Sequence, residues 1–285
     1  MRAIVFNDTS RFHHGCSAVM RVLHRELEQA GVEVLETVYG NTWALQKAYP
    51  DYRQSSWQEA DLVVINGEGT MHDDAKLAVY YMEEVVKKCT GKKLALVNTL
   101  WHRMSPHYAK TLADADLVTV REPLSCRELG LKFSVTMPDL SYYDVPVYGK
   151  LPGQGLVKGT FYRRVFDDLE LDGKINIKRE DWGVIVNKLR HAKACLTGKH
   201  HEVIACCVAK CPFVTTSIDT HKIAGLGSYI GENLPQLDVH ADEKTVRNEL
   251  IKASEDSSGV YTRLFQKMES IRASTRLKDL IEAMS

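Results

Sequence analysis

The sequence predicts an α/β protein that consists of two Rossmann-like domains facing a cleft. Short apolar runs alternate with helical patterns along both halves of the chain, which is typical of βαβ units and parallel sheets. Several runs are almost continuously apolar, as expected of strands covered by helices on both faces. A stretch rich in proline and glycine, residues 142–155, separates the halves. We therefore expect an N-terminal domain over residues 1–145 and a C-terminal domain over residues 146–285.

The N-terminal half alternates between strand and helix patterns. Apolar side chains at helical spacing indicate a helix over residues 17–30, and Gly31 follows it as a stop signal. Further helical patterns cover residues 107–112 and 124–129 and the stretch that leads to Val86. The expected strands are Ala3–Phe6, Val32–Val38, Asp61–Asn66, Leu94–Asn98, Leu117–Val120 and Phe133–Thr136.

The C-terminal half repeats this alternation and ends in a charged tail. The expected strands are Leu156–Phe161, Lys174–Ile177, Ala192–Thr197 and Pro212–Ser217. Helices are expected at Trp182–Leu189 and His201–Ala209, and the tail after Glu243 carries apolar residues at helical spacing. The second half thus predicts a second sheet of parallel strands with helices around it.

The composition excludes several classes of protein. Lysine plus arginine and aspartate plus glutamate both number 37, so the chain lacks the basic field of a protein that holds nucleic acid mainly by charge. No apolar run approaches the roughly 18 to 20 residues that span a bilayer, and the short apolar run at residues 3–6 leads us to expect a strand there and no cleavable signal. Seven cysteines scattered through apolar segments fit buried thiols of a reducing compartment. We expect a cytoplasmic protein whose oligomeric state stays open.

Ligands of such sheets bind beyond the carboxyl ends of the strands, so the residues after each strand are the candidates for a site. The loop after the first strand leads directly into a helix, whose N-terminus attracts anions. Two glycines flank a carboxylate after the third strand, where a ligand can approach the backbone. The candidates in these two loops are Ser10, Arg11, His13, His14, Gly15, Gly67, Glu68, Gly69, Thr70, His72 and Asp73, and Trp101 follows the next strand.

Three of these side chains, Glu68, His14 and Asp73, are candidate general bases. In the second half, a strand ends at Thr197 and a helix begins shortly afterwards, with cationic side chains between them. This arrangement suits a phosphate or a carboxylate. The candidates for such an anion clamp are Gly198, Lys199, His200, His201, Glu202, Asp219 and Lys222, together with Arg121, which alternatively pairs with a neighbouring glutamate. Adjacent histidines point apart on a helix, so we expect no metal there.

Four stretches of the chain, residues 61–73, 115–130, 137–143 and 196–222, resemble the polysaccharide pyruvyl transferase family, whose architecture is similar to that of B-type glycosyltransferases. In that family an arginine, one residue, and then histidine and glycine follow a strand and hold the acidic donor, and a later lysine assists. By this resemblance Lys199 stands in the place of the arginine and His201 in that of the histidine. Lys222 matches the later lysine, and Glu202 replaces the glycine.

The resemblance implies a transferase that moves a sugar or pyruvyl group from an activated anionic donor to a hydroxyl of a glycan. A lysine grips a carboxylate less specifically than an arginine, and Glu202 resembles the ribose-binding carboxylate of many B-type glycosyltransferases. A nucleotide sugar is therefore expected as the donor beside phosphoenolpyruvate. We expect no cofactor, because a helix N-terminus and cations can stabilise the leaving group. The alternatives are a glycosyltransferase acting on a modified DNA base, which makes nucleic acid a second acceptor, and an inactive nucleotide- or glycan-binding protein.

Overall fold

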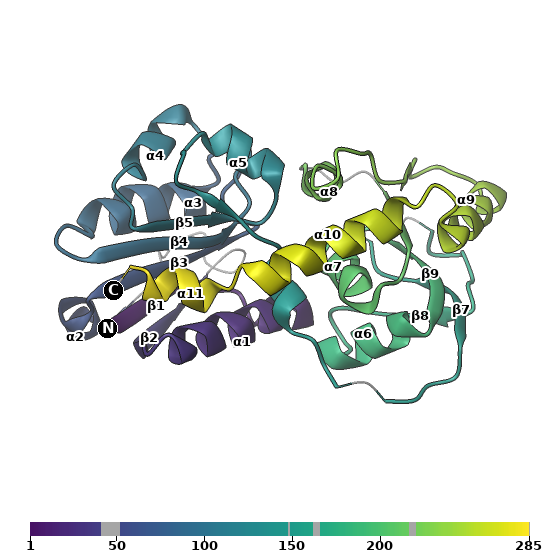
Figure 1. Cartoon of the computed structure of the whole chain (residues 1–285), viewed down its shortest axis with the longest axis horizontal. Helices are drawn as coiled ribbons and strands as arrows, with labels where there is room; N and C mark the ends of the chain where they lie inside the picture. The colour runs from purple at the N-terminus through teal and green to yellow at the C-terminus, as the bar shows by residue number, and fades with distance from the viewer. Residues whose placement is uncertain (41–51, 148, 162–165, 217–220, 285) are drawn as a thin grey trace. The chain divides into compact units, whose positions relative to one another are not determined.

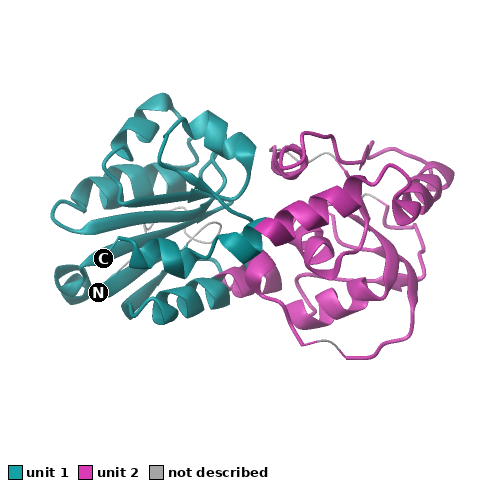
Figure 2. Cartoon of the chain, viewed as in Figure 1, with its two compact units in different colours: residues 1–9, 20–140, 271–285 teal, residues 10–19, 141–270 magenta. Residues whose placement is uncertain are grey.

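The chain divides into two compact units in the computed structural model (Figures 1 and 2). Unit 1 consists of Met1–Thr9, Met20–Leu140 and Ile271–Ser285, and unit 2 consists of Ser10–Val19 and Ser141–Ser270. The structure describes residues 1–40, 52–147, 149–161, 166–216 and 221–284. Within these residues no helix is both long and apolar enough to cross a bilayer.

The division between the units differs from the predicted one in two short segments. The main change of unit falls between residues 140 and 141, close to the predicted boundary at residues 145 and 146. Residues 10–19, however, belong to unit 2, and residues 271–285 belong to unit 1. Both changes occur inside a continuous helix, one in α1 (His14–Gln29) and one in α10 (Val260–Ser274). A unit boundary inside a helix is marked by no turn and no change of composition. The sequence pattern therefore does not indicate the boundaries within α1 and α10.

Unit 1 contains a six-stranded sheet in which every pair of neighbouring strands is parallel. Its strands are β1 (Arg2–Asp8), β2 (Glu33–Tyr39), β3 (Leu62–Glu68), β4 (Lys93–Thr99), β5 (Leu117–Val120) and β6 (Val135–Thr136). Their order is β2-β1-β3-β4-β5-β6, so the chain moves outward in opposite directions from the β1–β3 pair. The ends of all six strands agree with the predicted ends to within about two residues. Such a reversal of direction is where open α/β sheets bind ligands.

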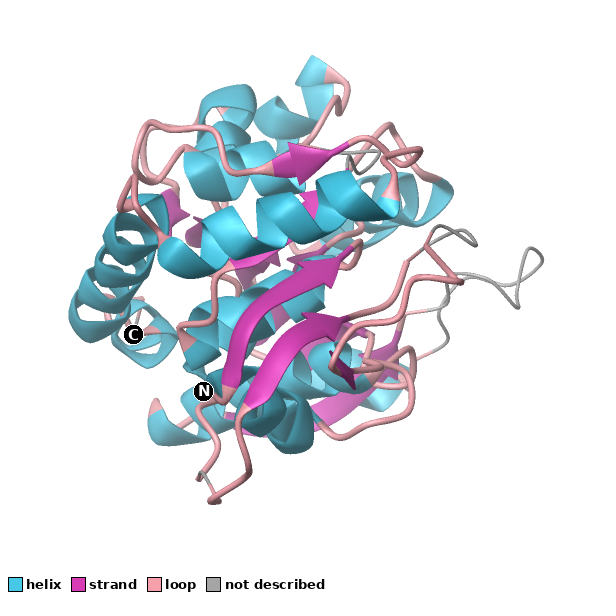
Figure 3. Ribbon diagram, turned by 90° about the vertical axis from the view of Figure 1, so that its right-hand side faces the viewer, coloured by secondary structure: helices cyan, strands magenta, loops and turns pink. Residues whose placement is uncertain are grey.

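The helices of unit 1 lie on both sides of the strands (Figures 1 and 3). Right-handed crossovers place α1, which connects β1 to β2, on the opposite face from the helices that follow β3, β4 and β5. Helix α5 shows why these short helices form where they do, because Glu122 caps its start at the Ser125 amide and Gly130, with φ of 70°, ends it. The remaining helices of this unit are α2 (Gln54–Glu59), α3 (Lys76–Tyr80), α4 (Pro106–Thr111), α5 (Pro123–Leu129) and α11 (Leu277–Glu282).

Unit 2 repeats the same plan with a five-stranded parallel sheet. The strands are β7 (Gln154–Lys158), β8 (Gly173–Lys174), β9 (Ala192–Thr197), β10 (Phe213–Thr216) and β11 (Gln236–Leu237), in the order β11-β10-β9-β7-β8. The direction of the chain therefore reverses between β7 and β9. The two helices predicted here are confirmed as α6 (Trp182–Arg190) and α7 (His200–Ala209), and α9 (Glu243–Glu255) and α10 form the predicted helical tail.

The sequence pattern missed two elements of unit 2, α8 (Lys222–Gly227) and β11. Both are short, and β11 pairs through only two residues, so neither carries a full period of apolar side chains. Helix α7 was recognised because all ten of its residues are buried, and its apolar sequence reflects that position. None of the described cysteines forms a disulfide, and all except Cys126 are buried, as the sequence predicted.

A buried carboxylate attaches the C-terminal segment to unit 1. Glu26 is 1% exposed and accepts hydrogen bonds from Arg276 Nε at 3.1 Å and from the Lys278 amide at 3.3 Å. Burial alone would raise the pKa of Glu26, but these hydrogen bonds outweigh it and lower the pKa below its ordinary value of 4.5. The ion pair thus stabilises the folded state when Glu26 is ionised.

We expect Arg276→Ala to lower the free energy of unfolding by about 2 kcal/mol, because it removes the principal charged partner of the buried Glu26 carboxylate, which then keeps the 3.2 Å pair with Arg25. In the wild type, this stabilisation is complete above pH 4.5 and is lost as the pH falls through the lower folded-state pKa of Glu26. Urea unfolding of the wild type and of Arg276→Ala between pH 3 and 7 measures the free energy of unfolding of each protein, with Arg272→Ala as the control. A difference between the two proteins that stays constant over this range would contradict the assignment.

Candidate functional site

Three strands of unit 1 end in residues with left-handed backbone conformations. Asn7 at the end of β1 has φ of 66°, Glu68 at the end of β3 has φ of 37°, and Asn98 near the end of β4 has φ of 56°. The strands are neighbours in the sheet, so these residues lie along one carboxyl edge. Non-glycine residues rarely adopt positive φ, and such conformations concentrate at functional sites. This edge is therefore the candidate site of unit 1.

Buried amide side chains link the three strand ends. Asn7 Nδ2 donates to the Asn66 carbonyl and to Thr70 Oγ1 at 3.0 Å. Asn66 Nδ2 in turn donates to the Asn7 carbonyl at 3.2 Å, and Asn98 Nδ2 donates to Asn66 Oδ1 at 3.3 Å. Asn7 and Asn66 are fully buried, and Asn98 is 1% exposed. A polar network of this kind fixes the positions of the groups at the edge of the sheet.

The carboxylate of Glu68 is held within this network. Its Oε2 accepts hydrogen bonds from Thr9 Oγ1 and, at 3.2 Å, from Asn66 Nδ2. Glu68 is 5% exposed and lies at the point where β3 meets β1 and β4. A carboxylate fixed at the carboxyl edge of a parallel sheet has the position and the chemistry of a general base.

The turn after β3 is built around two of the predicted residues. A Cβ atom on Gly67 would lie 2.2 Å from Thr99 Oγ1, so only glycine fits between β3 and β4 at this point. The carbonyl of Gly67 accepts the Thr70 amide at 2.9 Å, which closes a tight turn through Gly69. The turn therefore brings the Thr70 hydroxyl against Asn7 of the network.

Asp73, the second predicted base of unit 1, has different surroundings. It is exposed and accepts from His72 Nδ1 at 2.9 Å and from Arg103 Nε at 2.7 Å. The hydrogen bond from His72, with that from Arg103, lowers the pKa of the Asp73 carboxyl. Asp73 is thus an exposed, ion-paired carboxylate, whereas Glu68 is buried among the strand ends, and this position makes Glu68 the stronger candidate.

Two predicted site residues of unit 1 have buried side chains. Arg121 is 2% exposed, and its Nη1 pairs with Asp139 Oδ2 at 3.0 Å, so its charge is engaged within the fold. Trp101 is also 2% exposed and packs in the hydrophobic core of unit 1, while its backbone N–H donates to Ser125 Oγ at 2.8 Å. Both residues follow strands, as the prediction assumed, but their side chains turn inward.

In unit 2, the point where the sheet reverses direction is organised by Glu202, which is fully buried in the first turn of α7. Its Oε2 accepts from the Thr160 amide at 2.8 Å and from Thr197 Oγ1. Its Oε1 accepts from Thr160 Oγ1 at 2.6 Å and from the Ile177 amide at 3.1 Å. Burial raises the pKa of Glu202, and these hydrogen bonds oppose that effect.

Glu202 therefore joins the segments that follow β7, β8 and β9 instead of facing a ribose, and the predicted direct contact with the donor is corrected to a positioning role. A Cβ atom on Gly159 would lie 2.2 Å from Glu202 Oε2, so glycine is required where this carboxylate meets the loop after β7. The sequence pattern suggested Glu202 but missed its partners Thr160 and Thr197. Hydroxyl residues at the ends of two adjacent strands were the available signal.

Among the described members of the predicted clamp, Lys199 has a half-buried side chain beside the start of α7. It is the residue before the helix, and its amide donates to Thr197 Oγ1 at 3.0 Å. Partial burial, together with the nearby cation of Lys178, lowers the pKa of Lys199 to about 8. An anion beside two lysines and the first turn of a helix would be stabilised by all three.

The other members of the clamp lie nearby in different settings. His200 and His201 are each 6% exposed, with ring centroids 5.5 Å apart, so they are packed side chains. Gly198 is buried, and a Cβ atom there would lie 2.7 Å from Phe161 Cδ1. Lys222 is half-buried at the first position of α8. Asp219 lies outside the described residues.

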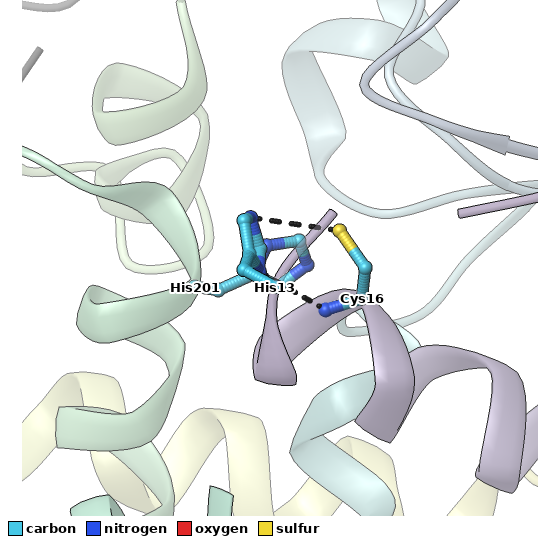
Figure 4. A group of neighbouring side chains, drawn as sticks. All are labelled: His13, Cys16 and His201. Atoms are coloured by element: carbon cyan, nitrogen blue, oxygen red, sulfur yellow. Dashed lines mark hydrogen bonds between the residues drawn. The ribbon is translucent and has the colours of Figure 1, made fainter. Parts of the chain in front are cut away.

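Residues 10–19, which comprise the loop after β1 and the start of α1, belong to unit 2, whereas the sequence predicts them within the N-terminal domain of residues 1–145. The His14 amide donates to the Ile177 carbonyl at 3.0 Å, and His14 Nδ1 lies 4.0 Å from Asp181 Oδ2. A Cβ atom on Gly15 would lie 2.5 Å from the Cβ of His201, so glycine permits this close contact. His13 and Cys16 lie beside His201 (Figure 4). The Ser10 carbonyl accepts a hydrogen bond from the Ser17 hydroxyl, and Arg11 is exposed.

Solved structures that share this fold include several glycosyltransferases. The glycotransferase of kitacinnamycin is 13% identical with a TM-score of 0.60, and the match covers 99% of this chain and 98% of that one. Spinosyn rhamnosyltransferase SpnG, complexed with thymidine diphosphate, is 12% identical with a TM-score of 0.59 and full coverage of both chains. The glycosyltransferase SnogD from Streptomyces nogalater is 11% identical with a TM-score of 0.52, also with full coverage. These likenesses show a glycosyltransferase B-like fold, as the sequence predicted.

The family is shown by a separate comparison. The profile described as polysaccharide pyruvyl transferase matches residues 13–220, which is most of the chain and includes residues of both units. A comparison with curated proteins found no match. Family and fold together indicate an enzyme that transfers a group to glycans. The chain therefore belongs to the polysaccharide pyruvyl transferase family.

Proposed function

We propose that the protein transfers a sugar or pyruvyl group from an activated anionic donor to a hydroxyl of a glycan, and that unit 2 binds the donor. The observation that carries the proposal is the position of Lys199. It lies directly before α7 and at the end of β9, where the unit 2 sheet reverses direction. Open α/β sheets bind ligands at this point, and helix N-termini bind anions.

The donor's phosphate or carboxylate would contact the Lys199 ammonium and the backbone N–H groups that point out of the first turn of α7. Lys178 adds a second positive charge nearby. Glu202 acts indirectly, because its four hydrogen bonds hold the segments after β7, β8 and β9 in place around the same end of the helix. His201, which matches the family's donor-binding histidine, lies one residue before Glu202.

The nature of the donor follows from charge and shape. A lysine binds an anion as a point charge, whereas the arginine of the family motif grips a carboxylate with two parallel hydrogen bonds. Lys199 can therefore bind a phosphate or a carboxylate, but without the two-bond geometry by which the family's arginine would hold phosphoenolpyruvate. SpnG, which has this fold, was determined with thymidine diphosphate, and this supports a nucleotide sugar as the donor.

The acceptor would bind at the carboxyl edge of unit 1, and Glu68 would remove the proton from its hydroxyl. Thr9 and Asn66 hold one oxygen of this carboxylate and so fix its orientation. The leaving group's negative charge would be stabilised in unit 2 by Lys199 and the end of α7.

Donor binding by the wild type and by Lys199→Ala tests this proposal. Titration calorimetry with UDP, GDP, CMP, thymidine diphosphate and phosphoenolpyruvate identifies the ligand that binds most tightly. We expect the substitution to raise its dissociation constant at least about tenfold, since a charge-assisted hydrogen bond is worth roughly 1.5 to 3 kcal/mol. Lys193→Ala is the matched control, because Lys193 is exposed near the other end of β9.

An unchanged dissociation constant in Lys199→Ala would contradict the proposal, as would an equal loss of affinity in Lys193→Ala. Incubation of the wild type with the labelled donor separates an enzyme from a binding protein. Breakdown of the donor, or transfer to a glycan acceptor, is the expected result. Tight binding without either reaction would favour the binding protein, and transfer to duplex DNA with hydroxymethylated bases would favour a DNA acceptor.

A further inference from the structure

Three side chains with metal-ligating atoms lie together in unit 2, at the ends of two helices (Figure 4). His13 and Cys16 come from the N-terminal end of α1, and His201 comes from the first turn of α7. Their ligand atoms all lie within 4.8 Å of one another. His13 and Cys16 have two residues between them, a spacing common for pairs of zinc ligands, and His201 is far from both in the sequence. The fold therefore creates the cluster.

We propose that His13, Cys16 and His201 bind one transition-metal ion of the zinc type. In a tetrahedral zinc site, bonds of about 2.3 Å to sulfur and 2.0 to 2.1 Å to nitrogen place the two ligand atoms about 3.5 Å apart. Cys16 Sγ lies 3.5 Å from His13 Nε2. The rings of His13 and His201 pack edge to face, with a centroid distance of 4.9 Å and an angle of 68°. The ligand atom of His201 lies within 4.8 Å of the other two, so His201 is the third ligand of the proposed set.

The backbone around the cluster holds the two helix ends together. The Gly15 backbone approaches the Cβ of His201 so closely that a Cβ atom at position 15 would lie 2.5 Å away. The His14 amide donates a hydrogen bond to the Ile177 carbonyl at 3.0 Å, and this contact fixes the start of α1. Cys16 is 3% exposed and His201 is 6% exposed, while His13 is half-buried. Ligands on rigid, largely buried elements lose little freedom when a metal binds.

The donor set determines which metals fit. Two imidazoles and one thiolate suit Zn²⁺ and Co²⁺, whereas Mg²⁺ and Ca²⁺ prefer oxygen ligands. Binding releases the thiol proton of Cys16 to solvent. It also places the proton of His13 on Nδ1, because Nε2 must bind the metal. The 3.3 Å hydrogen bond that Nδ1 now accepts from the Cys16 amide is then lost. Three protein ligands leave the fourth position of a tetrahedral ion for water or an anion.

The site has a consequence for catalysis that rests on the proposed function. His201 matches the donor-binding histidine of the family and lies two residues after Lys199. A metal bound to His201 withdraws this side chain from the donor. Zinc is therefore expected to weaken donor binding in the wild type.

Cobalt absorption tests the site without any donor. We expect Co²⁺ to bind the wild-type chain at one equivalent, with the thiolate-to-cobalt charge-transfer band and the visible bands of a tetrahedral complex. Zn²⁺ should displace the cobalt. Cys16→Ser should abolish the charge-transfer band and weaken zinc binding by more than roughly 100-fold, since loss of a supporting contact alone costs 10- to 100-fold. Cys126→Ser, which changes a partly exposed thiol of unit 1, should keep the band.

Absence of the charge-transfer band in the wild type, or its persistence in Cys16→Ser, would overturn the proposal. Circular dichroism of each variant shows whether the fold is kept, and His13→Gln is a second variant that should weaken zinc binding without removing the thiol. Lys199→Ala separates this inference from the proposed function. This variant should reduce donor affinity and leave the cobalt spectrum unchanged. An unchanged donor affinity would contradict the proposed function alone, and a lost cobalt spectrum would contradict the metal site alone.

Discussion

Replacing Glu68 by glutamine is expected to slow group transfer by roughly 10²- to 10⁴-fold, the usual contribution of a general base. The glutamine side-chain oxygen can still accept the hydrogen bonds from Thr9 and Asn66, so the fold and the edge of the sheet should be retained. We propose that the donor binds in unit 2, so its dissociation constant should not change. Single-turnover transfer rates and donor titrations on the same preparation measure both quantities.

Asp73→Asn is the matched control for Glu68→Gln, because Asp73 lies in the same turn region but is exposed and paired with Arg103. We expect this variant to transfer at nearly the wild-type rate. Normal turnover in Glu68→Gln together with a slow Asp73→Asn would move the base to Asp73. Normal turnover in both would place the base outside unit 1, with His14 as the remaining candidate.

Glu202→Gln is expected to lower the free energy of unfolding by about 2 to 4 kcal/mol, although it conserves the size of the side chain. Each carboxylate oxygen accepts one backbone N–H, from Thr160 or from Ile177. A glutamine amide group must turn its NH₂ toward one of them, and two donors then face each other in a buried place. Leaving a buried polar group unsatisfied costs roughly 1 to 3 kcal/mol, and more beside a charge.

Urea unfolding of Glu202→Gln and of the control Glu249→Gln measures this effect. Glu249 is on α9 and forms an ion pair with Lys252 at the surface, so its substitution should change stability by less than about 0.5 kcal/mol. Donor affinity should also fall in Glu202→Gln, because the segments around the start of α7 lose their common anchor. Wild-type stability in Glu202→Gln would show that Glu202 does not hold these segments.

Much of the fold could be predicted because buried parallel strands leave a strong signal. Apolar runs such as Leu62–Ile65 are covered on both faces, and every strand predicted from such a run is present. The strand ends also indicated Glu68 and Lys199 as candidates. Two-residue strands such as β11 could not be predicted, since pairing through two residues requires no repeated pattern.

The site could be predicted only in outline, because contacts between distant segments have no local signature. Asn7 and Asn98 look like ordinary strand ends in the sequence, and their positive φ angles result from the network across three strands. Arg121 looked like a ligand cation until its buried partner Asp139 was placed beside it by the fold. The sequence shows no relation between Cys16 and His201, because only the fold places residues 10–19 in unit 2 beside α7.

The most direct test of donor binding by unit 2 is a crystal structure with the tightest ligand of the titration panel bound. The phosphate or carboxylate of that ligand should lie at the first turn of α7, within hydrogen-bonding distance of Lys199 Nζ and of backbone N–H groups. An anion bound at the carboxyl edge of unit 1, beside Glu68, with nothing at the start of α7, would contradict the account.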